Sequence, residues 1–170
     1  IGNVENITFK QMTVTNTTGS GHGIHMRNAK VELFDVALKG CIRHALDMSG
    51  STSETTVVAT RCEFAISEFG ALVSGSLTSA TFKNCVFYDN KYDGMYISNK
   101  AKIHLHGEAT ATHSNGRHGI CANASNPNPN PNIASCQVVI HLPSRHNTSY
   151  NNGRQDRITH GGGTITNVED

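Results

Sequence analysis

The fold is decided by the stretch Phe82-Lys83-Asn84-Cys85-Val86-Phe87-Tyr88-Asp89-Asn90, which is followed closely by Asp93-Gly94-Met95-Tyr96-Ile97. Apolar residues alternate in it, a polar corner interrupts the alternation, and a glycine begins a second apolar run. The same order occurs one unit earlier, with Cys62 lying 23 residues before Cys85 and Gly70 lying 24 residues before Gly94. Self-similarity at a period of about 20–50 residues indicates stacked units, because a single unit cannot bury its apolar face alone.

Six such units can be laid out along the chain. They cover approximately residues 4–29, 30–56, 57–79, 80–100, 101–132 and 133–168. Each contains short alternation of apolar and polar residues, which is typical of strands. Residues that tolerate a positive φ at tight corners separate the strands, as in Asp89-Asn90, Asn115-Gly116 and Asn152-Gly153. No stretch has a sustained helical period, so the sequence predicts an all-β chain.

The unit at residues 82–97 resembles the repeat of the right-handed parallel β-helix superfamily, the pectate-lyase-like group. That repeat has an apolar residue, a Cys or Asn, a Phe, an Asn and a Gly-led apolar run at similar intervals. The resemblance extends over about 160 of the 170 residues. It implies a right-handed parallel β-helix, a single-stranded β-solenoid, of about six coils. It implies no particular activity, because the repeat encodes only the stacking.

Lyases of this superfamily often bind Ca²⁺ through clustered acidic residues, and the present sequence departs from that pattern. Asp89 and Asp93 share one corner, whereas Asp47 and Glu68 stand apart in the sequence. Calcium requires about six to eight oxygen ligands, which two aspartates in one turn do not supply. The sequence therefore assigns no catalytic residue, no metal-ligand set and no cofactor.

The last two units are matched at an offset of 37 residues, which pairs Ile103-His104-Leu105 with Ile140-His141-Leu142 and Asn115-Gly116 with Asn152-Gly153. The surplus over the usual spacing falls on the Pro/Asn-rich run at 126–132, where proline blocks ladder pairing. We therefore expect one β-helix domain over residues 1–170 with a loop excursion at 123–135. No amphipathic cap is evident, so we expect a segment of a longer protein or self-association through open coil ends.

The composition excludes some kinds of binding partner but leaves the cellular compartment open. The net charge is +1 with scattered Lys and Arg, which argues against nucleic acid, and no apolar run is long enough to span a membrane. Five cysteines without C-x-x-C spacing argue against a zinc site and a full disulfide framework. Cys62 and Cys85 are expected to be buried as small hydrophobes. The compartment stays open, because the odd cysteine count favours an intracellular protein and four N-x-S/T sequons favour an extracellular one, at Asn6, Asn16, Asn123 and Asn147.

The stretch from His104 to Glu108 carries the most reactive side chains. Alternate strand residues share a face, so His104, His106 and Glu108 are expected to line one outer surface. The 37-residue register places His141 and Arg145 one layer above His104 and Glu108. Such a surface is most typical of an exposed sheet without a ligand. Side chains on a flat face lie in one layer, whereas tetrahedral coordination needs ligands that surround the ion. A carbohydrate site and a Zn²⁺, Ni²⁺ or Cu²⁺ site are the alternatives.

A second candidate cluster lies at the corner after the fifth unit, where Arg117 and His118 follow His113 and Asn115. Arginine beside asparagine on a protruding loop can recognise the carboxylate of an acidic sugar. Ordinary turn chemistry with a solvated arginine explains the same residues. His22 and His25 form a weaker pattern, since one lies at a turn and the other alternates outward.

Together these features favour a non-catalytic recognition or structural module that presents a rigid face to a carbohydrate or a protein partner. The first alternative is a carbohydrate-active enzyme, namely a polysaccharide lyase, epimerase or hydrolase. The second is a fibre or virion assembly element in which open coil ends mediate stacking.

Overall fold

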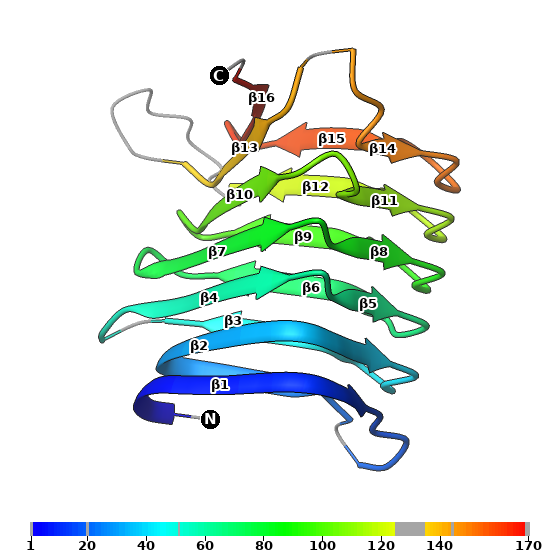
Figure 1. Cartoon of the computed structure of the whole chain (residues 1–170). Coiled ribbons are helices and arrows are strands. Elements are labelled where there is room, and N and C mark those ends of the chain that lie inside the picture. Colours follow the sequence, from blue (N-terminus) through cyan, green and yellow to red (C-terminus); the bar gives the residue numbers. More distant parts are fainter. Residues whose placement is uncertain (1, 20, 51, 125–134, 144, 169–170) are drawn as a thin grey trace.

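The computed structural model describes residues 2–19, 21–50, 52–124, 135–143 and 145–168, with side chains from residue 6 onward. Its strands are all parallel and stack as a β-solenoid of about six coils (Figure 1). The described residues contain no helix. The predicted fold class is therefore confirmed: the chain is all-β and is wound from stacked parallel strands.

Each coil contributes to three faces, which we name A, B and C (Figure 1). Face A contains β3 (His44–Ser49), β6 (Phe69–Ser74), β9 (Met95–Ser98), β12 (Ile120–Asn123) and β15 (Arg157–His160). Face B contains β4 (Thr55–Thr60), β7 (Thr78–Lys83), β10 (Lys102–His106), β13 (Gln137–His141) and β16 (Thr164–Asn167). Face C contains β5 (Glu63–Ala65), β8 (Val86–Tyr88), β11 (Ala111–His113) and β14 (Ser149–Tyr150).

The first two coils are built from long strands that bend around the corners. β1 (Gly2–Val14) pairs with β2 (Ile24–Lys39) along nearly its whole length. The beginning of β2 pairs with β3 on face A, its middle pairs with β4 on face B, and its end pairs with β5 on face C. Within β2, the alternating apolar residues are all buried, namely Val31, Leu33, Val36 and Leu38.

The interior of the solenoid is filled by one apolar cluster that runs through the coils. Phe64, Phe82 and Phe87 are fully buried, and the rings of Phe64 and Phe87 stack at 4.7 Å between centroids. Full burial of one such side chain contributes about 1.5–3 kcal/mol. Cys62 and Cys85 are buried beside them as expected, and the backbone N–H of Cys62 donates to Sγ of Cys85 at 3.4 Å.

Two columns of residues with positive φ form the corners on either side of face C. Between faces B and C the column consists of Gln11, Asp35, Arg61, Asn84 and Gly107. After face C it consists of Gly40, Ile66, Asp89, Ser114 and Asn151. At each of these two corners, one residue of left-handed conformation per coil turns the chain sharply, which is why the corners are short and the faces stay in register.

The asparagines expected to adopt positive φ have another role. Asn90, Asn115 and Asn152 do not have positive φ, since the preceding residue of each corner takes that conformation. Their side chains instead form a ladder: the backbone N–H of Asn90 donates to Oδ1 of Asn115, and that of Asn115 donates to Oδ1 of Asn152. The ladder satisfies backbone groups at the buried corner, where unpaired donors are costly.

Glycines allow the coils to approach one another at the start of face A. A Cβ on Gly70 would lie 2.5 Å from the backbone oxygen of Gly94, and one on Gly94 would lie 2.8 Å from that of Gly119. The glycine before each apolar run in the repeat is therefore a packing requirement. Of the loop excursion expected at 123–135, residues 125–134 lie outside the described residues.

Candidate functional site

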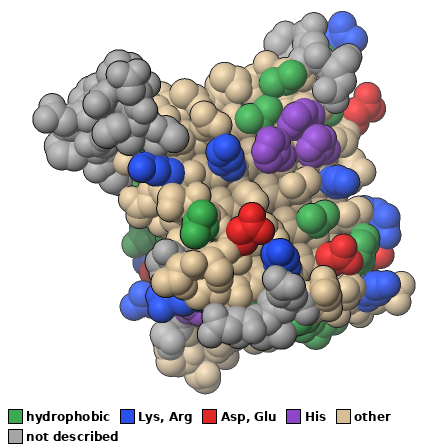
Figure 2. All heavy atoms as spheres, turned by 90° about the vertical axis from the view of Figure 1, so that its left-hand side faces the viewer, with side chains coloured by type: hydrophobic (Ala, Val, Ile, Leu, Met, Phe, Trp, Pro, Cys, Tyr) green, Lys and Arg blue, Asp and Glu red, His purple; other side chains and the backbone are tan. Residues whose placement is uncertain are grey.

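The predicted histidines of the fifth and sixth coils lie together on the outer surface of face B. His104 and His106 come from β10 and His141 from β13, and we call them the histidine patch (Figure 2). Nδ1 of His104 lies 3.0 Å from Nε2 of His141. The rings of His106 and His141 stack at 4.0 Å with an interplanar angle of 9°. Burial, and then the charges of His141 and Lys102, lower the pKa of His104, which favours the neutral form of this imidazole.

The register within the histidine patch differs from the expected one by two residues. β10 pairs with β13 so that Leu105 lies beside Ile140 and His106 beside His141, an offset of 35 residues. On face C the offset is 37 residues, since Thr112 pairs with Ser149. The expected pairing of His104 with His141 is therefore wrong. A shift of two residues keeps side chains on the same face, so the imidazoles still meet.

Glu108 and Arg145 do not belong to the histidine patch. β10 ends at His106, and the chain turns at Gly107, where φ is positive, so Glu108 lies beyond the corner. The backbone oxygen of Glu108 lies 2.8 Å from Nε2 of His146. Arg145 lies after β13 and lines a shallow hollow together with His146, Asn147, Ser149, Gln155, Asp156 and Arg157.

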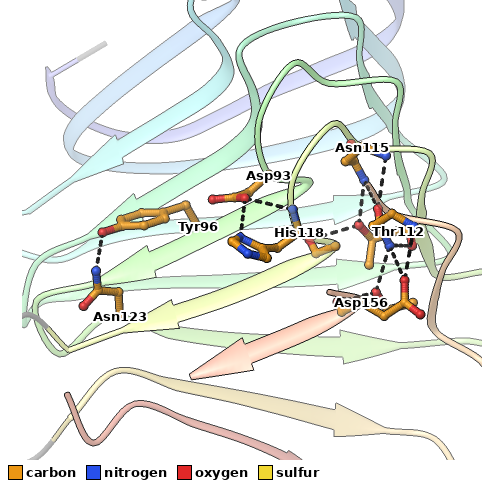
Figure 3. Close-up of polar contacts among 10 residues, drawn as sticks. Asp93, Tyr96, Thr112, Asn115, His118, Asn123 and Asp156 are labelled. Carbon is orange, nitrogen blue, oxygen red and sulfur yellow. Dashed lines mark hydrogen bonds and ion pairs between the residues drawn. The ribbon is translucent and has the colours of Figure 1, made fainter. Parts of the chain in front are cut away.

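Arg117 and His118 lie just before β12, on the approach to face A. His118 is buried, and Asp93 accepts hydrogen bonds from it at both its backbone N–H, at 3.0 Å, and its Nδ1, at 2.9 Å (Figure 3). His118 is therefore hydrogen-bonded to Asp93 in the interior and does not lie exposed on a protruding loop. Arg117 is half-buried, and its guanidinium carbon lies 5.8 Å from the ring centroid of Tyr92.

A buried cysteine completes this polar group. One ligand atom each from Asp93, His118 and Cys121 lies within 4.8 Å of the others. Burial, and then the charge of Asp93, raise the pKa of the Cys121 thiol to about 12. Only the thiolate is strongly nucleophilic, so Cys121 is held in its unreactive form at neutral pH.

Three aromatic rings form a row on the outer surface of face A, and we call them the aromatic row. Phe69 lies at the start of β6, Tyr92 lies in the bend before β9, and Tyr96 lies within β9. The ring of Phe69 is 5.3 Å from that of Tyr92 and 5.9 Å from that of Tyr96. Nδ2 of Asn123 donates to the hydroxyl of Tyr96 at 2.9 Å (Figure 3). All three rings are half-buried and lie outside the apolar core cluster.

A histidine cluster around one carboxylate lies on face A, where the start of β2 pairs with β3. Nδ1 of His22 and Nδ1 of His44 each lie 3.5 Å from Oδ2 of Asp47, and Nδ1 of His25 lies 3.1 Å from it. Burial, and then the charges of His44 and His25, lower the pKa of His22 against the opposing charge of Asp47. Burial alone raises the pKa of Asp47, but the electrostatic influence of His44 and His25 outweighs it and lowers that pKa.

This cluster is not among the sites expected from the sequence, although the sequence contains a signal for it. Asp47 stands apart in the sequence, and the corner that precedes His44 contains no Asn. Yet His22 precedes His44, and His25 precedes Asp47, by the same 22 residues. The structure pairs His25 with Asp47 on adjacent strands. Reactive residues that are separated by one repeat length therefore identify such a cluster.

No protein-family model matches the sequence, and neither the curated proteins nor the solved structures contain a match to this chain. Among the described residues, no helix is long and apolar enough to cross a membrane. The function therefore has to be argued from the chemistry of the faces.

Proposed function

We propose that the chain is a non-catalytic recognition module that binds a carbohydrate on the outer surface of face A. The observation that carries the proposal is the aromatic row of Phe69, Tyr92 and Tyr96, with Arg117 beside it. Aromatic rings on the outside of a solenoid do not fill its core, so their position calls for another explanation. Binding of a sugar explains the position of these rings, since the C–H faces of a sugar ring stack on aromatic rings and its hydroxyls form hydrogen bonds with nearby polar side chains.

The polar groups around the aromatic row suit a ligand with hydroxyl or carboxylate oxygens. Nε of Arg117 is buried and has no hydrogen-bond partner among the described residues. An unpaired buried donor is costly, so a ligand oxygen that accepts from it would be stabilising. The guanidinium also has the fork geometry that suits a carboxylate, which favours an acidic sugar.

The rings are held by the fold before any ligand binds. Phe69 and Tyr96 belong to strands that pair with neighbouring coils, and Asn123 fixes the hydroxyl of Tyr96. A preorganised surface loses little conformational entropy on binding, which improves affinity for a given contact area. This rigidity is what a recognition module needs.

The reactive groups nearest to the aromatic row favour binding over catalysis. Glycoside hydrolysis commonly uses two carboxyl groups, one of which acts as a general acid. Here Asp93 is buried and engaged by two hydrogen bonds from His118, and the Cys121 thiol stays protonated. Glu68 is half-exposed and lies 3.9 Å from the ammonium group of Lys91.

The test is a glycan array that includes acidic polysaccharides, followed by titration calorimetry on the best ligand. Tyr92→Ala and Tyr96→Ala are each expected to weaken binding by about tenfold, since loss of one stacking ring costs about 1–1.5 kcal/mol. Tyr150→Ala is the matched control, because Tyr150 stacks on His113 on face C instead. Equal losses in all three variants, or no glycan bound more tightly than about 1 mM, would overturn the proposal.

A product assay on the same polysaccharides separates binding from catalysis. Incubation with the wild-type protein is expected to release no new reducing ends and no unsaturated sugars. Sustained product formation that Tyr92→Ala abolishes would show that face A is a catalytic surface and would contradict the non-catalytic assignment.

A further inference from the structure

Two imidazoles and one carboxylate come together on face A, where the start of β2 lies beside β3. The backbone N–H of Gly23 donates to the oxygen of His44 at 3.0 Å, and this bond sets His22 beside His44. A Cβ on Gly23 would lie 2.5 Å from the oxygen of Ala45, so only glycine permits this approach. The rings of His22 and His44 lie 4.8 Å apart and are inclined by 64°.

The polar atoms of this group have an unmet requirement. Nδ1 of His22 and Nδ1 of His44 are both buried, and neither has a hydrogen-bond partner among the described residues. Each lies 3.5 Å from Oδ2 of Asp47, which is longer than the roughly 2.7–3.2 Å of an N–H···O hydrogen bond. Leaving a buried polar atom unpaired costs about 1–3 kcal/mol. Two such atoms at the same distance from one carboxylate oxygen point to a partner that all three share.

A divalent metal ion meets this requirement in both chemistry and size. Zinc binds histidine nitrogen at about 2.0–2.1 Å and carboxylate oxygen at about 2.0–2.2 Å, usually in tetrahedral geometry, which separates two ligand atoms by about 3.4 Å. The observed separations of 3.5 Å agree with that value. The ligand atoms offered by His22, His44 and Asp47 also all lie within 4.8 Å of one another.

We propose that His22, His44 and Asp47 form a binding site for Zn²⁺ or a similar divalent transition metal, with a fourth position open to solvent. The side chains of His22 and His44 are 20% and 13% exposed, so the cluster lies at the surface of face A, although the two Nδ1 atoms themselves are buried. His25 acts as a positioning residue, because its Nδ1 lies at hydrogen-bond distance, 3.1 Å, from the Asp47 carboxylate. Hydrogen bonds of this kind orient metal-ligating carboxylates.

The histidine patch on face B fits a metal less well, although it contains three imidazoles. Its rings are stacked at interplanar angles of 9–27°, so their lone pairs run side by side instead of converging. Nδ1 of His104 and Nε2 of His141 lie 3.0 Å apart, which is a hydrogen-bond distance. The patch also has no carboxylate within the group. It therefore serves as the matched control for the site on face A.

The experiment is calorimetric titration of Zn²⁺ into the whole chain, prepared without a histidine tag. The wild type is expected to bind one equivalent with a Kd of about 1 μM or tighter. His44→Ala is expected to weaken this binding at least 100-fold, and His25→Ala by about tenfold, the size of effect seen for groups that orient ligands. The double variant His104→Ala/His141→Ala is expected to retain the wild-type Kd within about threefold, since the two clusters share no residues.

A spectroscopic readout guards against a variant that merely misfolds. Co²⁺ in a tetrahedral site gives visible absorption bands, which are expected for the wild type and absent for His22→Ala and for Asp47→Asn at unchanged circular dichroism. The proposal is overturned if the wild type binds Zn²⁺ no more tightly than about 1 mM. It is also overturned if His44→Ala binds as the wild type does, or if only the face B variant loses binding.

Discussion

Asn115 accepts two hydrogen bonds from Asn90 through a single side-chain oxygen, one from the backbone N–H at 3.2 Å and one from Nδ2 at 2.9 Å. Both residues are buried. Nδ2 of Asn115 is in turn within hydrogen-bond distance of the backbone oxygen of Phe87 and of Oδ1 of Asn152. Each rung of the ladder thus joins two neighbouring coils, and it does so immediately before the chain enters face A.

Asn115→Ala is expected to destabilise the protein by about 2–4 kcal/mol, because it leaves at least two buried donors of Asn90 without an acceptor. Urea unfolding followed by circular dichroism measures this loss. Asn147→Ala removes the same side chain at an exposed position and is expected to change the free energy of unfolding by less than about 0.5 kcal/mol. Similar losses for both variants would show that the ladder does not stabilise the coils.

Phe87→Ala is expected to cost about 3–5 kcal/mol, because it opens a cavity at the centre of the aromatic core. Phe87 is fully buried and contacts two further rings, with centroids 4.7 Å away on Phe64 and 4.9 Å away on Phe82. Thermal and urea unfolding check the prediction. Leu77→Ala provides the exposed comparison, since Leu77 is 42% exposed. A loss below about 1 kcal/mol for Phe87→Ala would contradict close packing at this position.

Glu63→Gln is expected to reduce the sensitivity of the protein to acid. The ion pair with Lys39, and then the hydrogen bond from Tyr88, lower the pKa of Glu63 from 4.5 against the opposing effect of burial. A lowered pKa gives stability that is present above the unfolded-state pKa and is lost as the pH falls through the folded-state pKa. At pH 7 the variant is expected to be less stable by no more than about 1 kcal/mol, since the side chain is 45% exposed.

Unfolding of the wild type and of Glu63→Gln at pH 7, at about pH 4.5 and at about pH 3 measures this effect. The difference between the two proteins is expected to shrink toward zero at the lowest pH, and titrating groups common to both cancel in that difference. A difference that stays constant over the whole range would show that the Lys39 ion pair does not depress the pKa of Glu63.

Zn²⁺ is expected to raise the melting temperature of the wild type but not that of His44→Ala. An ion present at 100 times its Kd stabilises the folded state by about 2.7 kcal/mol, which corresponds to about 5–10 °C for a chain of this size. Thermal unfolding in the presence of Zn²⁺ and then of excess chelator checks this. An equal rise in both proteins would locate the binding elsewhere.

The architecture could be predicted from the sequence because the same residues in each repeat both form the local strands and corners and stack on the neighbouring coils. Cys62 and Cys85, and Gly70 and Gly94, recur at one coil length because each occupies the same position in successive coils. The roles at the corners could not be read in the same way. An asparagine at a corner is suited either to a positive φ or to buried hydrogen bonding, and the sequence does not distinguish the two. Only the structure shows that Asn115 belongs to the ladder and Ser114 to the positive-φ column.

The candidate sites could be predicted only in part. His104, His106 and His141 were expected to share a face, and they do, but the 37-residue step was applied to every face. It is 35 residues on face B, because two of the additional residues lie between β13 and β14. The aromatic row could not be found from spacing, since Phe69, Tyr92 and Tyr96 occupy different positions in their coils and meet only through side-chain direction.

The most direct test of the central claim, that face A is the recognition surface, is an NMR titration of the isotopically labelled protein with the glycan that it binds best. Amide shifts are expected to concentrate at Phe69, Tyr92, Tyr96 and Arg117, with little change at Tyr88, His113 and Tyr150 on face C. Shifts concentrated on face C, or on the histidine patch of face B, would contradict the assignment of recognition to face A.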